Sequence, residues 1–209
     1  KNHFSNSGMG NSEITDYSYN SVKRAIDAVA DSEVVECNLM AIPGIYKAGL
    51  TKHLIDVCES RADALAIIDL ENDFKDASEN GRDENHSTRK ASVSSAVTSL
   101  RARALNSSYG ASYFPWCTIR DDNSGTIVPV PPSVIGLGVM SYGQSKSELW
   151  FAPAGFTRGG LSENKAAGLP VVGVKYVLSS KDRDKLYDAN INPIATFPNE
   201  GIVVFGQKT

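Results

Sequence analysis

The sequence predicts an α/β fold with an α+β tendency: a central mixed sheet with flanking helices plus β-hairpins. Two short apolar runs, residues 34–42 and 64–70, are separated by an amphipathic segment, which is the pattern of two parallel strands joined by a crossover helix. Toward the C-terminus, two β-prone runs are separated by residues 198–201, whose proline, asparagine and glycine indicate a tight turn. Parallel pairing early in the chain and antiparallel pairing at its end together predict a mixed sheet.

Helical spacing of apolar residues predicts three helices in the first half of the chain. Their apolar faces consist of Val22, Ile26 and Val29, of Leu50, Leu54, Val57 and Cys58, and of Val93, Val97, Leu100 and Ala104. Asp16 or Asn20 can cap the first helix through a side-chain oxygen. Ser87 or Thr88 can cap the third, which is expected to run over residues 89–106.

The second half is predicted to alternate between strands and short helices. A β-prone stretch at residues 109–120 turns through residues 121–125 into residues 126–130, which indicates a hairpin. Residues 131–140 begin with two prolines, which a first helical turn tolerates, so a short helix is expected there. Residues 171–178 are apolar and β-branched, which is typical of a further strand.

The last thirty residues are the most strongly patterned part of the chain. Ser179 and Asp182 have the spacing of a capping box for a helix over residues 181–187. The Asn-rich exit at residues 191–194 leads into a strand, and a second strand is expected over residues 202–205. These elements predict a helix followed by a hairpin.

Composition excludes several classes of protein. The 209 residues are 41% apolar and 22% charged, as in a globular domain with or without an appendage. A formal net charge of −3 argues against nucleic-acid binding, and no apolar run approaches the roughly 20 residues that span a bilayer. The Asn-, Ser- and Gly-rich start predicts an N-terminal arm or linker over residues 1–20 and a core domain over residues 21–209.

The three cysteines are expected to be buried free thiols. Cys37, Cys58 and Cys117 are odd in number, widely spaced and without a C-x-x-C pair. Unpaired cysteine packs like a small apolar residue, so burial explains these positions better than a disulfide or a zinc site. This usage fits assembly in a reducing cytoplasm.

One cluster is compatible with an enzyme or a ligand-binding domain. Four carboxylates follow a predicted parallel strand, where α/β ligand sites form: Asp69, Glu71, Asp73 and Asp76. The segment has no lysine or histidine placed to orient them, and an acidic loop is usually a solvated surface. The histidines show no metal-ligand spacing either, so no catalytic, cofactor-binding or metal-ligating residue is predicted outside this alternative.

Two long segments remain that no such chemistry explains. Residues 149–161 read LWFAPAGFTRGGL, where bulky aromatics beside glycines indicate an irregular backbone packed on the domain's own core or at a subunit interface. Residues 183–209 read RDKLYDANINPIATFPNEGIVVFGQKT. The residues that carry the two patterns are Trp150, Phe151, Pro153, Gly155, Arg158, Gly159, Arg183, Tyr187, Asn192, Pro193, Phe197, Pro198, Gly201, Gly206 and Gln207.

These two segments closely resemble the core of contractile tail sheath proteins of myovirus-type, T-even-like bacteriophages. Members of that family carry variants of W-F-A-P-A-G-x-x-R-G and, further on, of R-D-x-L-Y-x-x-x-I-N-P-I-x-x-F-P-x-x-G-I-V-V-x-G-Q-(R/K)-T. Their chains continue past the second pattern into a C-terminal domain. The resemblance therefore implies a central fragment of a longer chain, which alone is expected to be monomeric or weakly associated.

The resemblance also implies a structural protein, not an enzyme, with no cofactor. The implied partners are other sheath subunits in six-fold rings, the tail tube protein and the baseplate, with no nucleic acid and no membrane insertion. Contraction of such a sheath drives the tube through the host cell envelope for genome ejection. The implied location is the virion tail, after assembly in the host cytoplasm. Sheaths of pyocins or type VI secretion systems, and tube or baseplate proteins, are the structural alternatives.

Overall fold

The computed structural model of the protein describes residue 9 and residues 16–70, 92–121, 123–161 and 171–209. Its strands are β1 (Leu39–Ala41), β2 (Leu65–Ile68), β3 (Gly110–Phe114), β4 (Cys117–Arg120), β5 (Ile127–Val130), β6 (Val171–Val174), β7 (Asn192–Phe197) and β8 (Gly201–Val204). Its helices are α1 (Tyr17–Ala28), α2 (Ala48–Arg61), α3 (Val93–Ala102), α4 (Pro132–Lys146), α5 (Gly155–Arg158) and α6 (Ser180–Asp188).

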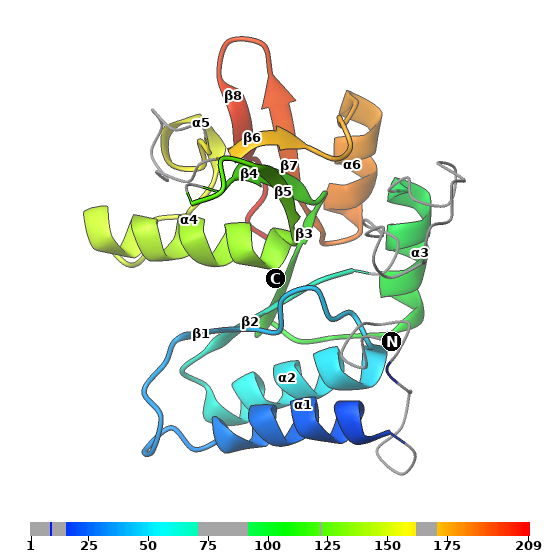
Figure 1. Ribbon diagram of the computed structural model, residues 1–209, viewed down its shortest axis with the longest axis vertical. Helices are drawn as coiled ribbons and strands as arrows, with labels where there is room; N and C mark the ends of the chain where they lie inside the picture. The colour runs from blue at the N-terminus through cyan, green and yellow to red at the C-terminus, as the bar shows by residue number, and fades with distance from the viewer. Residues whose placement is uncertain (1–8, 10–15, 71–91, 122, 162–170) are drawn as a thin grey trace.

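A five-stranded mixed sheet runs through the centre of the molecule in the order β1-β2-β3-β7-β8 (Figure 1). The first four strands pair in parallel, and β8 pairs antiparallel to β7 as a hairpin. A second sheet, in the order β5-β4-β6, is antiparallel throughout. The predicted mixed sheet with flanking helices and β-hairpins is confirmed.

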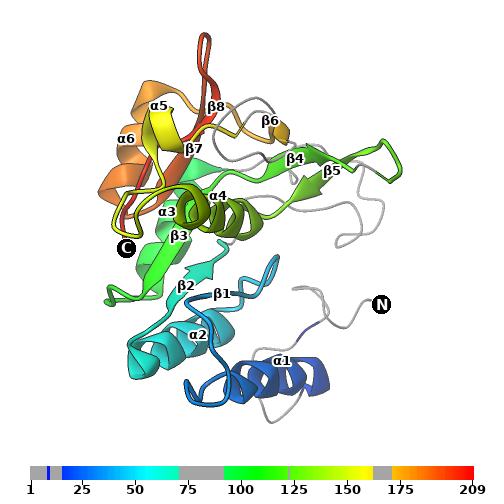
Figure 2. The ribbon, with the colours of Figure 1, turned by 90° about the vertical axis from the view of Figure 1, so that its left-hand side faces the viewer.

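Strand β2 is buried on both faces, which explains its uninterrupted apolar sequence. Ala66 and Ile68 belong to the core cluster that includes α1 and α2, whereas Ile67 packs with Ile135 and Val139 of α4. Successive strand residues point to opposite faces, so α2 and α4 cover opposite sides of β2 (Figure 2). A strand sandwiched in this way needs apolar residues at every position.

A third core cluster joins α3 and α6 beside the middle of the central sheet. Phe114 at the end of β3 and Leu186 of α6 are both fully buried in it, together with Ala96 of α3. This cluster holds α6 against the start of β7, so the C-terminal hairpin is fixed to the rest of the sheet.

Side-chain caps begin three of the helices. The Asp16 carboxylate accepts the backbone N–H groups of Ser18 and Tyr19 at the start of α1, as predicted. The predicted capping box at α6 is confirmed. For α3, the predicted caps Ser87 and Thr88 lie outside the described residues, and the helix is instead capped by Ser92.

Helix α3 is also shorter than predicted at its C-terminal end. It stops at Ala102, and Ala104 adopts a left-handed conformation with φ of 48°, which ends an α-helix. Ala104 is therefore exposed, and Ala96 takes its place in the buried stripe beside Val93.

The strand predicted over residues 34–42 was too long, because Arg61 holds the first half of that run as a loop. Its side chain, 1% exposed, donates to the backbone carbonyls of Val29, Val35 and Cys37. Carbonyls engaged by a guanidinium are not available for a strand ladder. Only Leu39–Ala41 form β1, and Val34 is exposed.

The single strand predicted over residues 109–120 is two strands in different sheets. Strand β3 ends at Phe114 in the central sheet, and β4 begins at Cys117 in the second sheet, with Pro115 between them. Proline has no N–H to donate to a ladder, so the pairing changes there. The predicted hairpin is confirmed for β4 and β5, which pair from Cys117 to Arg120.

Two further boundaries differ from the prediction. Helix α4 extends past Met140 to Lys146, and β6 stops at Val174. Of the cysteines, Cys58 and Cys117 are buried free thiols as predicted, and Cys37 is half-buried. Among the helices of the described residues, none has the length and apolar composition needed to cross a lipid bilayer.

Candidate assembly site formed by the two sequence motifs

The first motif closes the outer edge of the central sheet. The Gly159 carbonyl accepts the Val204 N–H at 2.8 Å, and the Leu161 N–H donates to the Ile202 carbonyl at 2.8 Å. Gly160 forms an isolated antiparallel bridge with Val203 between these bonds. A free strand edge presents unpaired backbone groups to other chains, so this segment covers that part of β8 within the subunit.

Gly159 is needed because the backbone of β8 approaches it closely. A Cβ atom at this position would collide with the Val204 carbonyl oxygen and would lie 2.9 Å from the Gly155 carbonyl oxygen. We therefore expect Gly159→Ala to lower the free energy of unfolding by about 1–3 kcal/mol, because β8 must move away. Chemical denaturation monitored by circular dichroism measures this change.

Gly143→Ala is the matched control for that substitution. Gly143 lies inside α4, and an added Cβ would meet only the Pro153 side chain at an ordinary 3.9 Å. Alanine favours a helix interior over glycine, so this variant should be as stable as the parent or up to about 1 kcal/mol more stable. Equal destabilisation by both alanines would contradict a specific role for the contact at β8.

The same motif carries a pair of adjacent aromatic rings, tilted by 52° to each other, and a cation. Gly155, with φ of 81°, begins the short helix α5, and Arg158 at its end lies 3.9 Å above the centre of the Phe151 ring. The Trp150 ring packs against Phe151 with centroids 4.3 Å apart, yet its side chain is 77% exposed. Trp150 therefore contacts Phe151 while remaining exposed.

The two motifs meet in a cluster of three phenylalanines. Phe156 of α5 contacts Phe197 of β7 at 4.9 Å and Phe205 after β8 at 5.5 Å between ring centroids, and Phe197 lies 5.2 Å from Phe205. The Arg183 guanidinium of α6 lies 5.1 Å from the centre of the Phe197 ring. Phe156 and Phe205 stand at variable positions of the motifs, so the predicted set omitted them; their aromatic character was the available signal.

Asn192 anchors the second motif in the interior. Its fully buried amide donates to the carbonyls of Ser112 (3.1 Å) and Lys208 (2.8 Å), and its carbonyl accepts the Lys208 N–H. A Cβ at Gly206 would lie 2.7 Å from the Asn192 side-chain oxygen, so glycine is required there. The side chain thus joins β3, β7 and the final residues.

Two further motif residues, Pro193 and Tyr187, lie beside this anchor. Pro193 pairs with Phe114 and accepts the Phe205 N–H, and the Lys208 ammonium lies 3.7 Å above the Tyr187 ring. Gly201 begins β8, whereas Pro198 in the turn and Gln207 near the end are exposed. The two motifs therefore meet at the phenylalanine cluster and where residues 159–161 pair with β8.

Asp69 is buried and bonded to groups of its own chain. The carboxylate, 1% exposed, accepts the Ser133 N–H at 3.0 Å, the Ser133 hydroxyl at 2.8 Å and the Gly44 N–H at 2.7 Å. Burial raises the pKa of Asp69 to about 6, against the lowering effect of these bonds. Helix α4 has Pro131 at its N-cap with no side-chain bond, and Asp69, directly after β2, accepts the Ser133 N–H of its first turn.

The acidic-loop alternative therefore receives no support from the described residues. Glu71, Asp73 and Asp76 lie outside them, and Asp69 is held by three donors away from solvent. No cluster of three His, Cys, Asp or Glu side chains suited to a metal ion occurs in the described part of the chain.

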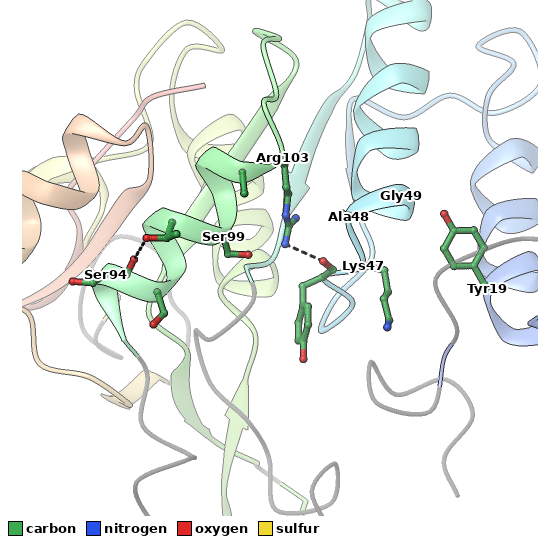
Figure 3. A pocket seen from close by; sticks show the side chains of 11 residues that line it. Tyr19, Lys47, Ala48, Gly49, Ser94, Ser99 and Arg103 are labelled. Carbon is green, nitrogen blue, oxygen red and sulfur yellow. Dashed lines mark hydrogen bonds between the residues drawn. The ribbon is translucent and has the colours of Figure 1, made fainter.

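A cavity of about 930 Å³ lies between α3 and the start of α2, away from both motifs (Figure 3). It is lined by Lys47 and Arg103 together with hydroxyl groups of α3. Arg103 donates to the Thr51 hydroxyl and the Tyr46 carbonyl, so its guanidinium ties the end of α3 to α2. Among the described residues that line it there is no histidine, cysteine or carboxylate.

Fold and motifs together define a structural α/β module whose patterned residues hold a sheet edge and a chain terminus in place. Sequence comparison then relates the chain to phage tail sheath proteins. It is 35% identical over 82 residues to the tail sheath protein of Vibrio phage KVP40 and 30% identical over 82 residues to that of Enterobacteria phage T4. Each match covers 39% of this chain and 11% of the relative.

Solved structures with the same fold come from a contractile particle. The structure aligns with a chain of the anti-feeding prophage baseplate (TM-score 0.57) and with a chain of its contracted helical sheath (TM-score 0.53), both at 18% identity. The alignments cover 92% and 96% of this chain but 43% and 45% of those chains. No model of a known protein family matches the sequence. The chain is thus similar in sequence to tail sheath proteins over 39% of its length and spans only part of the length of these relatives.

Proposed function

We propose that this chain is the core of a sheath subunit in a contractile bacteriophage tail. In this role it polymerises with copies of itself around a tail tube and contracts, which drives the tube through the host cell envelope. The work comes from the free-energy difference between two packings of the same subunits, so no active site is needed. The sequence match to two tail sheath proteins carries the proposal.

The finer features follow the same proposal. Subunits form six-fold rings, the tail tube protein lies inside them, and the baseplate terminates them. The subunit resides in the virion tail after assembly in the host cytoplasm. Residues 21–209 are its core domain and residues 1–20 an arm, and the core is one part of a longer subunit. The motif residues keep this core rigid, as the bonds of Asn192 and the packing of Gly159 support.

Negative-stain electron microscopy of the full-length subunit, alone and with its tail tube protein, tests this function. We expect cylinders with a helical surface that are wider and shorter without the tube than with it. Dispersed globular particles under both conditions would overturn the sheath proposal. Polymers of one fixed diameter in both conditions would instead favour a tube or baseplate protein.

A further inference from the structure

The two motifs build an exposed aromatic surface that carries positive charge. We define the aromatic surface as Trp150, Phe151, Phe156, Phe197 and Phe205 with Arg158 and Arg183. Its residues form two groups of contacts, with Trp150, Phe151 and Arg158 in one and Phe156, Phe197, Phe205 and Arg183 in the other, and Phe156 and Arg158 both belong to α5. Phe156 is 47% exposed and Phe205 is 41% exposed, in addition to Trp150. Single exposed apolar residues are common, but neighbouring aromatics with arginine are typical of protein interfaces.

A segment of opposite character lies near the other end of the molecule. Residues 31–36, with the sequence DSEVVE, connect α1 to β1 and expose Asp31, Glu33 and Glu36 around Val34, which is 75% exposed. Residues 16–70 as a whole carry nine acidic against five basic side chains, whereas residues 175–209 carry five basic against four acidic. The acidic excess is therefore four charges in residues 16–70, whereas residues 175–209 have a basic excess of one.

This acidic segment has a fixed shape. The Asp31 carboxylate accepts the Glu33 N–H at 2.9 Å, the Asp31 carbonyl accepts the Val35 N–H at 3.1 Å, and Arg61 donates to the Val35 carbonyl at 3.0 Å. A turn that is already ordered loses little conformational entropy when it docks. Val34 is thus presented as a preformed apolar contact ringed by carboxylates.

The two surfaces cannot meet within one subunit. Helices α5 and α6 and strand β8 lie at one end of the long axis, and α1 and α2 lie at the other, in both views (Figures 1 and 2). A contact between the aromatic surface and residues 31–36 therefore requires two copies of the chain.

We propose that residues 31–36 of one copy dock on the aromatic surface of the next copy, so that subunits associate head to tail. Val34 packs on the phenylalanine rings, while Glu33 and Glu36 face Arg158 and Arg183. The aromatic surface is not complementary to itself, because two such surfaces would oppose their arginines. The contact is therefore heterologous, the type that propagates into rings or helical polymers. This inference rests on the proposed function as a repeating subunit.

Site-specific photo-crosslinking tests the contact. Phe156 is replaced by p-benzoylphenylalanine, a larger aromatic residue that crosslinks on irradiation. The protein is irradiated in concentrated solution and, as the full-length subunit, in its polymer. We expect crosslinked dimers whose joined peptide from the second copy contains residues 31–36. The same reagent in place of Ile127, an exposed residue of β5, should not label that peptide.

Charge reversal adds a test of the pairing. Glu36→Lys should reduce the dimer yield about fivefold through repulsion from Arg183, and adding Arg183→Glu to the same chain should restore it. Asp56→Lys is the matched control, because Asp56 is an exposed carboxylate of α2 at the same end. It should change the yield less than about twofold. Circular dichroism establishes that each variant is folded.

The possible failures are distinguishable from failure of the sheath function. Crosslinks to any other peptide, no crosslinks at all, or equal effects of Glu36→Lys and Asp56→Lys would overturn the docking contact. Cylinders that form in the microscope without the expected crosslinks would leave the sheath function standing. Expected crosslinks from a protein that forms no cylinders would leave the contact standing without that function.

Discussion

Replacing Asn192 by alanine is expected to lower the free energy of unfolding by about 3 kcal/mol, because a fully buried side chain loses three hydrogen bonds, one of them buried and two part-buried. The side chain is fully buried, and it bonds the Ser112 carbonyl and both backbone groups of Lys208. Alanine leaves these partners without the amide and opens a space between β7 and Gly206. Urea denaturation of both proteins gives the difference directly.

Hydrogen exchange shows whether the loss is localised as the structure requires. The Lys208 N–H donates to Asn192, so its exchange should accelerate in the variant more than exchange in α2, which lies in another core cluster. Asn199→Ala is the control, because Asn199 is exposed in the turn between β7 and β8 and should change stability by less than about 0.5 kcal/mol. Comparable losses for both variants would refute the anchoring role of Asn192.

The sequence predicted the elements whose signals are local. Helix α2 follows from the spacing of Leu50, Leu54 and Cys58, and α6 follows from its capping box, because both depend on residues within a few positions of each other. The C-terminal hairpin was predicted for the same reason. The motif residues follow from the resemblance to sheath proteins, and their pattern does not indicate which of them touch.

The features that were missed depend on contacts between distant segments. Arg61 bonds carbonyls 24 to 32 residues earlier and so turns part of a β-prone run into a loop. Pro115 marks the point where the chain leaves one sheet for another, but no local signal tells which strands it will join. Asp69 caps α4 by bonding Ser133, which lies 64 residues later in the chain. From the sequence alone, an acidic residue after a strand had the pattern of a ligand site.

Asp69 is also expected to make stability depend on pH in an unusual direction. Burial raises the pKa of this carboxyl from 3.8 to about 6, so the folded protein holds the proton more tightly than the unfolded chain does. The contribution of Asp69 to stability is therefore complete below the unfolded pKa and decreases as the pH rises through 6. Between pH 4 and pH 7 the decrease amounts to about 2 kcal/mol.

Asp69→Asn replaces the titrating carboxyl group by an amide and should abolish this part of the pH dependence of stability. The measurement is the free energy of unfolding at pH 4 and pH 7 for both proteins, because contributions from other titrating groups cancel in the comparison. Asp182 is expected to contribute a pH dependence of the opposite sign. The Ser179 hydroxyl holds the pKa of Asp182 below its usual value, so Asp182 stabilises the folded state less as the pH falls. Asp182→Asn should remove that loss of stability at low pH. If Asp69→Asn leaves the pH dependence unchanged, Asp69 is not the buried, proton-retaining cap of α4. If the Asp69 carboxylate is instead accessible to solvent, a ligand site at the end of β2 becomes the better hypothesis.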